Sequence, residues 1–454
     1  MMKERLLEIA EKTVKLASKE KIDQAQATAF IRDTALTRYA NSQIHQNVAS
    51  KAGGVAIKVV KNKRMGTLRI NSLEEEQIRR AVRSVVKIAK VTPPNKDFKS
   101  LPQPRKWTPI RGVFDKETAE CSPDYRAESV KEIIETAHSK SPRVEAVAGS
   151  FFTGSMAFAI SNSLGVSAWA ELSLASVATT VISKAGGSQG FGSSEQHSRR
   201  VKDLDAVAVA SQAAEKSVRS VKPSKVPPGE YEVVLSPMAV SSFMVYLGYI
   251  GFSATPYQDG ESFVKYHLNK QVFDEKLTVK DDARDLKTLY TVPVDGEGVP
   301  KRKTQLIEKG KISENSICYD SLTAGREKKQ STGHAPLLGF GFRPAPINMI
   351  ASPGDSSLEE MIADTPRGIF VTRFHYTNPV EPTKAILTGL TRDGTFMIER
   401  GEMRKPVVNL RYTDSMLSAL RNIPLVGKEL ECLEEATVPA MKLERLRFTG
   451  VTEY

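Results

Sequence analysis

The sequence is poor in histidine and lacks the short motifs that mark many peptidase metal sites. Six histidines occur in 454 residues, and no two of them lie within one or two helical turns of each other. The patterns HExxH, HExxxH and CxxC are all absent. No short helical segment can therefore supply two imidazoles to one metal ion. The six residues are His45, His138, His197, His267, His334 and His375.

Long apolar runs and cysteines are also scarce. No stretch approaches the roughly 18 uncharged apolar residues that a membrane-spanning helix needs. The first residues carry charges at every helical turn and contain no apolar signal-peptide core. The three cysteines are odd in number and far apart, at Cys121, Cys318 and Cys432. We therefore expect reduced thiols in a cytoplasmic protein.

The net charge of +12 raises the question of nucleic-acid binding. The basic residues, however, occur in small scattered groups such as Lys301, Arg302 and Lys303. None of these groups lies beside a pattern of aromatic residues that could stack on bases, and no helix-turn-helix or RNA-binding motif is present. The charge pattern favours solvated surface charge over a nucleic-acid interface.

The first half shows one order of elements twice, which suggests an internal duplication. A helix is expected over 3–19, and strands over 25–48 and 54–70. A second helix is expected from Ser72, where Glu75 completes a capping-box pattern. A proline-containing connection over 91–118 follows. The same order then recurs. A helix is expected over 123–139 with Ser122 as N-cap, strands over 143–152, 154–162 and 166–184, and a second helix over about 203–219.

A proline-rich segment divides the chain into two predicted domains. Residues 221–229 contain three prolines and a glycine, which cannot continue a helix or a central strand. We expect an α+β domain over 1–220 and a β-rich, mainly antiparallel domain over 230–454, which makes the fold class α+β. Hairpins are predicted at 308–310, 392–394 and 400–402. The apolar run from Met238 to Phe252 predicts a buried helix, and it would also suit a subunit contact or an apolar peptide-binding wall.

Several segments along nearly the whole chain resemble the TldD/PmbA family, also called modulators of DNA gyrase. Each segment alone is a weak signal, whereas their order and spacing together are fairly specific. They are the runs 38–47 (RYANSQIHQN), 161–165 (SNSLG), 269–282 (NKQVFDEKLTVKDD), 295–299 (DGEGV), 331–335 (STGHA) and 392–396 (RDGTF).

The resemblance implies that one branch of the family, TldD, consists of zinc peptidases. These carry HExxxH on a helix soon after the strand that opens the C-terminal domain, and a cysteine ligand near the C-terminus. In this chain the corresponding window is Val245–Ile250 and contains neither imidazole nor carboxylate. Tyr246 and Tyr249 stand there, and phenols that titrate near ~10 are poor zinc ligands at neutral pH. Cys432 does not match the cysteine pattern, and we expect an inert thiol there.

The run 331–335 resembles the other branch, PmbA or TldE. This resemblance implies a metal-free, non-catalytic subunit that pairs with a TldD-type homologue bearing HExxxH and helps to enclose unfolded peptides. It implies no catalytic residue and no cofactor in this chain, with zinc only in the partner. We expect no membrane association and no nucleic-acid partner, and a homodimer of the isolated chain stays open.

Three further residues are candidates for a peptide cleft or a partner interface. His334 lies in a glycine-flanked turn, and its ring either holds that loop by hydrogen bonds or lines the cleft. Arg343 and Arg373 could bind peptide carbonyls or a terminal carboxylate, although ordinary surface arginine is the simpler interpretation.

Two other functions remain open at this stage. One is a self-contained hydrolase whose ligands or nucleophile converge from distant segments, although Gly-x-Ser-x-Gly is absent. The other is a protein that binds nucleic acid or gyrase. The glycine-rich segment Gly186–Ser194 lacks the Gly-Lys-Ser/Thr of a phosphate loop, so a mobile loop is predicted there.

Overall fold

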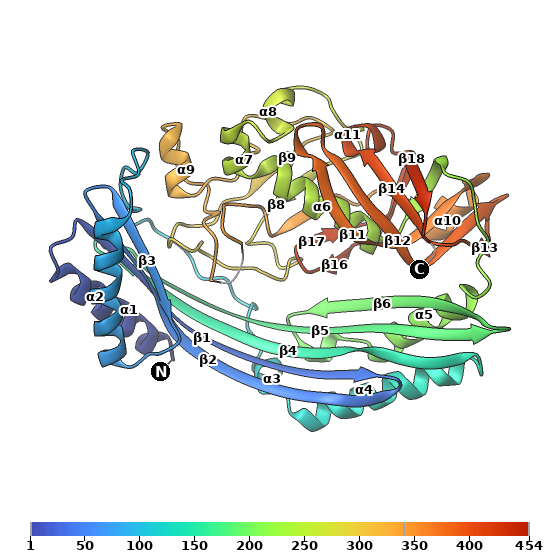
Figure 1. The fold of residues 1–454 in the computed structure, drawn as a ribbon, viewed down its shortest axis with the longest axis horizontal. Coiled ribbons are helices and arrows are strands. Elements are labelled where there is room, and N and C mark those ends of the chain that lie inside the picture. The colour runs from blue at the N-terminus through green and yellow to red at the C-terminus, as the bar shows by residue number, and fades with distance from the viewer. Residues whose placement is uncertain (1, 339–340, 453–454) are drawn as a thin grey trace.

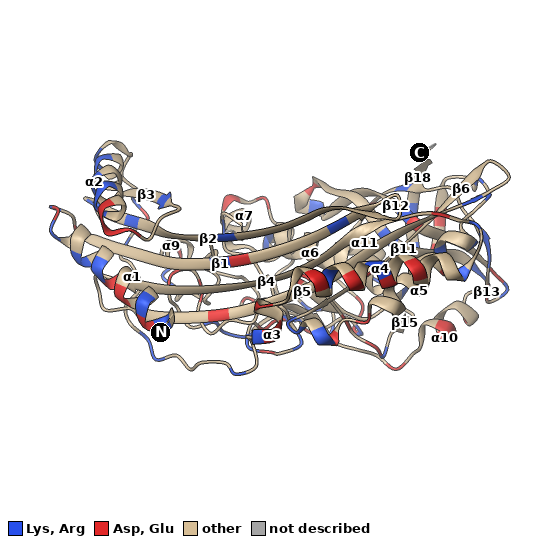
Figure 2. Ribbon diagram, turned by 90° about the horizontal axis from the view of Figure 1, so that it is seen from below, with Lys and Arg blue, Asp and Glu red and all other residues tan. Residues whose placement is uncertain are grey.

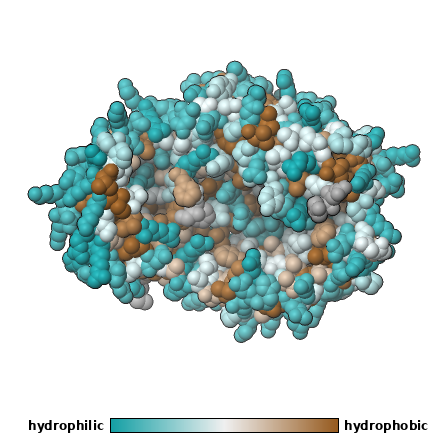
Figure 3. All heavy atoms as spheres, in the orientation of Figure 1, coloured by the Kyte–Doolittle hydropathy of each residue, from teal (hydrophilic) through white to brown (hydrophobic). Residues whose placement is uncertain are grey.

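The computed structural model describes residues 2–338 and 341–452 and shows two layers. A long, curved sheet from the first half of the chain forms the lower layer in Figure 1, and the second half lies above it. Figure 3 shows that the face seen in this orientation is hollowed between the two layers. Lys and Arg are spread over the elements seen in Figure 2 and do not gather into one stripe. No helix in the described part of the chain is long and apolar enough to cross a membrane.

The lower layer is a six-stranded antiparallel sheet in the order β3-β2-β1-β4-β5-β6. The first and fourth strands of the chain pair at its centre, with Phe30 opposite Phe158. Its strands are β1 (Gln24–Ala40), β2 (Gln43–Lys61), β3 (Arg64–Ile70), β4 (Val144–Asn162), β5 (Ser167–Ala185) and β6 (Ser188–Ser198). Its helices are α1 (Met2–Ser18), α2 (Glu75–Val91), α3 (Lys116–Ala119), α4 (Pro123–Lys140), the short η1 (Val201–Asp203) and α5 (Ala206–Arg219).

The repeated order of elements is present in the structure. Each unit contains a helix, three strands and a second helix, from α1 to α2 and from α4 to α5. In each unit the last helix packs closely on the last strand through glycine. A Cβ added at Gly66 would lie 2.4 Å from Val85 O, and one added at Gly192 would lie 2.2 Å from Ala213 O. Both distances are too short for any side chain. In both units, therefore, the last helix can approach the last strand closely only because glycine stands at the contact.

The same close approach corrects the loop predicted over Gly186–Ser194. Gly186 and Gly187 form a turn with φ of +56° and +80°, and β6 begins at Ser188. The later glycines are strand residues that let α5 approach. They do not form a mobile loop. The predicted strand over 25–48 is likewise divided by a turn at Asn41 and Ser42.

The predicted helix starts have different outcomes. Ser122 caps α4, since its Oγ accepts a hydrogen bond from Tyr125 N at 3.1 Å. The capping box at Ser72 is wrong. The Ser72 hydroxyl accepts from Glu74 N in the preceding turn, and α2 begins at Glu75 without a side-chain cap.

The upper layer contains a closed ring of five strands. The strands β7 (Gly229–Leu235), β18 (Met441–Val451), β14 (Leu410–Ser415), β12 (Ile386–Glu399) and β11 (Arg367–Glu381) pair in this order, and β11 returns to β7. The hairpin at Arg400 and Gly401 leads to β13 (Glu402–Pro406), as predicted. The hairpin predicted at 392–394 is wrong: this run lies inside β12, where the register against β11 shifts.

The remaining upper elements are short and pack beside the ring. A second sheet has the order β16-β17-β10-β8-β9, formed by β8 (Val279–Asp281), β9 (Thr304–Ile307), β10 (Met349–Ala351), β16 (Glu431–Leu433) and β17 (Ala436–Val438), while β15 (Leu425–Val426) pairs with β18. The helices are α6 (Pro237–Leu247), the π-helical turn η2 (Gly248–Phe252), α7 (Ala254–Asp259), α8 (Val264–His267), α9 (Ser321–Arg326), α10 (Leu358–Ala363), η3 (Pro382–Lys384) and α11 (Met416–Ala419).

The run 238–252 is a buried helical segment, as its composition predicts. Phe243 on α6 stacks on Phe374 of β11 with ring centroids 4.7 Å apart, and its edge meets Tyr412 of β14 at 5.6 Å. These aromatic contacts and the apolar area around them fix α6 against the ring. The end of this helix therefore has a defined position beside the segments described next.

Candidate functional site

A cleft of about 640 Å³ lies where the end of α6 meets the loops of the C-terminal half. This volume is within the range of sites for small ligands or short peptide segments. The wall is mostly apolar and aromatic, with a few charged groups. The lining residues are Val245, Tyr246, Tyr249, Lys301, His334, Ala335, Pro336, Leu337, Gly341, Phe342, Arg343, Ala345, Pro346, Ile347, Asn378, Pro379 and Glu435.

The helical window singled out in the sequence forms one wall of this cleft. Val245 and Tyr246 lie on α6, and Tyr249 lies on the π-helical turn η2. Tyr249 is 50% exposed, whereas Ile250 is buried in the core and does not line the cleft. The widened turn depends on glycine, because a Cβ added at Gly251 would lie 2.3 Å from the Phe263 ring. Such π-helical turns occur frequently at functional sites.

The donors in this wall do not fit a zinc ion. Burial and the neighbouring Tyr249 raise the pKa of Tyr246, so its phenol is neutral and cannot serve as an anionic ligand. His334 lines the cleft, but both of its ring nitrogens have protein partners. Across residues 2–338 and 341–452, no group of three or more His, Cys, Asp and Glu side chains could hold a metal ion. We therefore derive no metal-dependent step in this chain.

Arg343 brings a cation to the aromatic wall. Its guanidinium lies 3.8 Å from the centroid of the Tyr249 ring, and Nη2 donates a hydrogen bond to Tyr249 O at 3.1 Å. Its Nε is buried and has no hydrogen-bond partner within the described structure. A buried donor without a partner is costly, so a ligand oxygen bound there would be favoured. Gly339 and Phe340, which precede Arg343 closely in the chain, lie outside the described residues.

His334 is completely buried behind the cleft surface and holds its loop. Its Nε2 lies 2.8 Å from Asp281 Oδ2, and its Nδ1 lies 2.8 Å from Thr332 Oγ1. Burial and the charge of Lys301 lower the pKa of the His334 ring. We assign a neutral imidazole whose Nε2–H donates to Asp281 and whose Nδ1 accepts from Thr332. Of the interpretations left open by the sequence, this geometry matches a ring that fixes the loop.

Two buried carboxylates that the sequence analysis did not single out support the same segment. Asp281 also accepts a hydrogen bond from Asn348 N at 2.7 Å. Asp295 accepts from Ala335 N at 2.9 Å, and burial together with Glu297 raises its pKa to about 7. The sequence does contain a pattern that predicts burial of Asp281. Leu277, Val279 and Asp281 are alternate residues of one extended run, and all three are buried.

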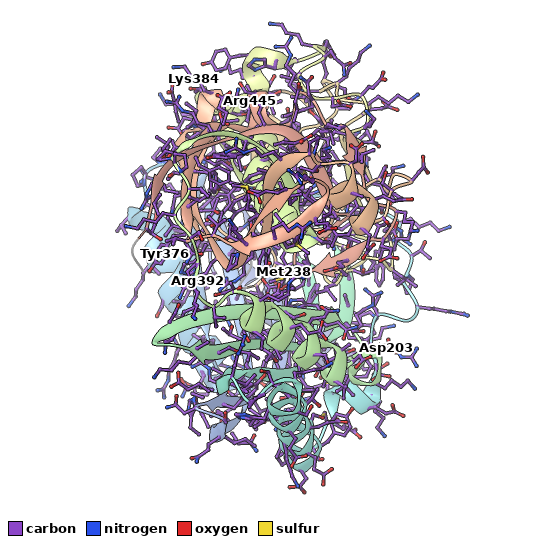
Figure 4. All side chains as sticks on the ribbon, turned by 90° about the vertical axis from the view of Figure 1, so that its right-hand side faces the viewer. Asp203, Met238, Tyr376, Lys384, Arg392 and Arg445 are labelled. Carbon is purple, nitrogen blue, oxygen red and sulfur yellow. The ribbon has the colours of Figure 1, made fainter. Side chains whose placement is uncertain are left out.

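Arg373, the third cleft candidate, lies elsewhere. Its Nε donates to Asp393 Oδ2 at 2.6 Å, and Ser193 Oγ of β6 donates to the same oxygen at 2.8 Å. Arg373 therefore helps to join the closed ring of five strands to the lower sheet. Figure 4 labels the adjacent Arg392, which lies at this boundary between the two layers.

The protonation state of His334 gives a testable prediction. The lowered pKa means that the ring stays neutral in the folded protein below its ordinary value of about 6.5. The unfolded chain takes up that proton first, so the stability contribution is present above pH about 6.5 and is lost as the pH falls below it. Ring ¹⁵N chemical shifts across a pH titration should report the Nε2–H tautomer at pH 6.5. The His334→Asn variant should lose this part of the pH dependence, and a ring that titrates above 6.5 would contradict the assignment.

The fold and the cleft define an α+β protein with a largely apolar cleft, in which the described residues form no cluster of metal ligands. The chain belongs to the PmbA/TldD metallopeptidase family. Three family models match it, described as PmbA/TldA metallopeptidase domain 1 over 32–89, central domain over 116–221 and C-terminal domain over 228–450.

Relatives and solved structures agree with this assignment. The chain is 24% identical over 405 residues to a metalloprotease from Methanocaldococcus jannaschii, with 86% of each chain covered. It is 23% identical over 430 residues to Metalloprotease PmbA from Escherichia coli O157:H7, which covers 91% of this chain and 89% of that protein. TldE from Thermococcus kodakarensis shares the fold with a TM-score of 0.89 at 22% identity, over 97% of this chain and 99% of that one.

Proposed function

We propose that this chain is a PmbA/TldE-like subunit that binds unfolded peptide in the cleft and pairs with a TldD-type homologue that carries the chemistry. The observation that carries the proposal is the end of α6, where the phenols of Tyr246 and Tyr249 line a cleft together with Arg343, whose Nε has no hydrogen-bond partner among the described residues. This wall can bind a peptide, and the side chains that the end of α6 and Arg343 contribute to it include no imidazole and no carboxylate. Catalysis is therefore assigned to the partner.

The chemistry of the cleft suits an extended, partly apolar peptide. Arg343 Nε can donate to a backbone carbonyl or to a terminal carboxylate, and the phenols of Tyr246 and Tyr249 supply neutral hydrogen-bonding groups. Phe342, Pro346 and Pro379 provide apolar contact area around these groups. Contacts to backbone and to general apolar surface favour unfolded segments over one particular sequence.

The partner is proposed from the family relationship. Over 207 residues, this chain is 26% identical to a protein named Metalloprotease TldD homolog from Buchnera aphidicola. The fold match to TldE from Thermococcus kodakarensis supports placing this chain in the other branch. Zinc would then be bound by the TldD-type subunit, and this chain would complete the peptide-binding chamber.

Removal of the cationic and aromatic contacts should weaken peptide binding. We expect Arg343→Ala to bind a fluorescently labelled unfolded peptide about tenfold more weakly, because it loses a charged hydrogen bond and a cation–π contact worth roughly 1–2 kcal/mol together. Tyr249→Ala should act in the same direction. Fluorescence anisotropy measures the dissociation constant.

The matched control is Arg105→Ala, which removes an exposed arginine outside the cleft. It should bind as the unmodified chain does. The proposed binding site is wrong if the unmodified chain binds no unfolded peptide, or if Arg343→Ala and Arg105→Ala bind it equally well.

A further inference from the structure

Lys301 is a deeply buried lysine that lines the cleft and has no partner for its charge. The residue is only 6% exposed. Among the described residues, no acceptor forms a hydrogen bond with its Nζ and no carboxylate forms an ion pair with it. Lysine is almost never buried to this degree unless it is paired. The three N–H donors of its ammonium group are therefore available to a ligand.

The carboxyl groups near Lys301 do not neutralise it by direct contact. Both oxygens of Asp281 already accept hydrogen bonds, from His334 Nε2 at 2.8 Å and from Asn348 N at 2.7 Å. Glu435 also lines the cleft, but burial and the neighbouring Glu434 raise its pKa, which disfavours a negative charge there. A buried charge without a partner is costly, so an anion that reached Lys301 would be bound favourably.

The backbone of Lys301 is held against the loop that carries His334. Lys301 N donates a hydrogen bond to Pro293 O at 3.0 Å. Gly333 packs directly on this backbone, because a Cβ added at Gly333 would lie 2.8 Å from Lys301 Cα. The φ of Gly333 is +79°, a conformation that favours glycine. The lysine side chain therefore starts from a fixed position beside His334.

The cleft has a buried floor and an exposed rim. Lys301 and Leu337 are each 6% exposed, whereas Tyr249 is 50% exposed and Phe342 is fully exposed. Arg343 lies on the Tyr249 ring and so belongs to the rim side. A peptide that continued in both directions would have to pass into the floor and out again. A chain end needs only one way in, and the chain end that is negative at neutral pH is the C-terminal carboxylate.

We propose that Lys301 binds the free C-terminal carboxylate of a peptide, with the last side chain on the apolar floor and the preceding residues running out past Arg343. This inference rests on the proposed peptide binding and adds that the cleft recognises a chain end. Hydrogen bonds between two charged groups are stronger than those between neutral groups, so the carboxylate would contribute strongly to binding. Arg343 Nε then remains for a backbone carbonyl nearer the rim. An acidic side chain of the peptide offers the same carboxylate chemistry, and the experiment separates these two sources.

The test is fluorescence anisotropy with an unstructured peptide that is labelled at its N-terminus, contains one glutamate and ends in leucine. We expect the C-terminal amide to bind the unmodified chain about tenfold more weakly than the free acid. Replacement of the peptide's glutamate by glutamine should leave binding unchanged. Lys301→Met should bind the acid and the amide equally, and Lys301→Arg should recover most of the preference for the acid.

The matched control is Lys303→Met, which removes an exposed lysine two residues away and should keep the full preference for the acid. Circular dichroism verifies that each variant is folded. Equal binding of the acid and the amide to the unmodified chain would overturn this inference while leaving the proposed peptide binding intact. A preference that persists in Lys301→Met, or one that follows the peptide's glutamate in place of its C-terminus, would also overturn it. If no form of the peptide binds, the proposed function and this inference are both wrong.

Discussion

Replacement of Asp281 by alanine is expected to lower the free energy of unfolding by roughly 2–5 kcal/mol, since each buried donor that loses its acceptor costs roughly 1–3 kcal/mol. Asp281 is fully buried, receives a hydrogen bond from His334 Nε2 and accepts another from Asn348 N. Its carboxylate also faces the charge of Lys301, which together with His334 lowers its pKa. Alanine leaves two buried donors, His334 Nε2 and Asn348 N, without their acceptor and removes the negative charge near Lys301.

Urea denaturation followed by circular dichroism measures this loss. Asp281→Asn keeps the size and one acceptor oxygen and should lose less stability than the alanine variant. The control is Asp259→Ala at the exposed end of α7, which should change stability by less than about 0.5 kcal/mol. A loss below 1 kcal/mol for Asp281→Ala would show that the pair does not hold the cleft loop.

The sequence was sufficient to locate one wall of the cleft but not the others. The window at Val245–Ile250 was identified from the resemblance, because it corresponds in position to the metal-binding helix of the TldD branch. The structure places three of its side chains in the cleft. His334 and Arg343 were singled out separately, from a glycine turn and from charge. The sequence contains no signal that brings them to α6. That contact depends on β8 and β10, which pair segments far apart in the chain.

The errors in the sequence interpretation have a common physical origin. Glycine at Gly190 and Gly192 was interpreted as loop-forming, whereas it permits close packing of α5 on β6. Asp393 and Gly394 were interpreted as a turn, whereas they form an irregular position inside β12 that binds Arg373. In both cases the residue type reflects a contact with a distant segment. Local patterns cannot distinguish these contacts from turns.

Arg373 illustrates the same limit for function. Its charge made it a candidate for the cleft, but its guanidinium is held by Asp393 at the boundary between the two layers. The partner that decides its role is 20 residues away in sequence and on another strand. Arg343 and Arg373 are equally good cleft candidates in the sequence. The structure places Arg343 in the cleft and Arg373 at the boundary between the layers.

The largest expected effect concerns peptide cleavage. This chain alone should leave an unfolded peptide intact, because catalysis is assigned to the partner. Its cleft offers the phenols of Tyr246 and Tyr249, the cations of Lys301 and Arg343, the single carboxyl of Glu435 and a fully bonded histidine. No cluster of metal ligands that could activate water lies among the described residues. Addition of a TldD-type homologue with an intact HExxxH motif should produce cleavage. Arg343→Ala in this chain should reduce cleavage by the pair through weaker peptide binding, with the zinc content of the partner unchanged.

The most direct test compares peptide cleavage and zinc content for this chain alone, for the TldD-type homologue alone and for both together. We predict cleavage only by the pair, with stoichiometric zinc in the homologue and none in this chain. As a control, the pair should be inactive when the glutamate of the partner's HExxxH motif is replaced by glutamine. Metal-dependent cleavage by this chain alone, or stoichiometric zinc bound to it, would contradict the account and favour a self-contained hydrolase.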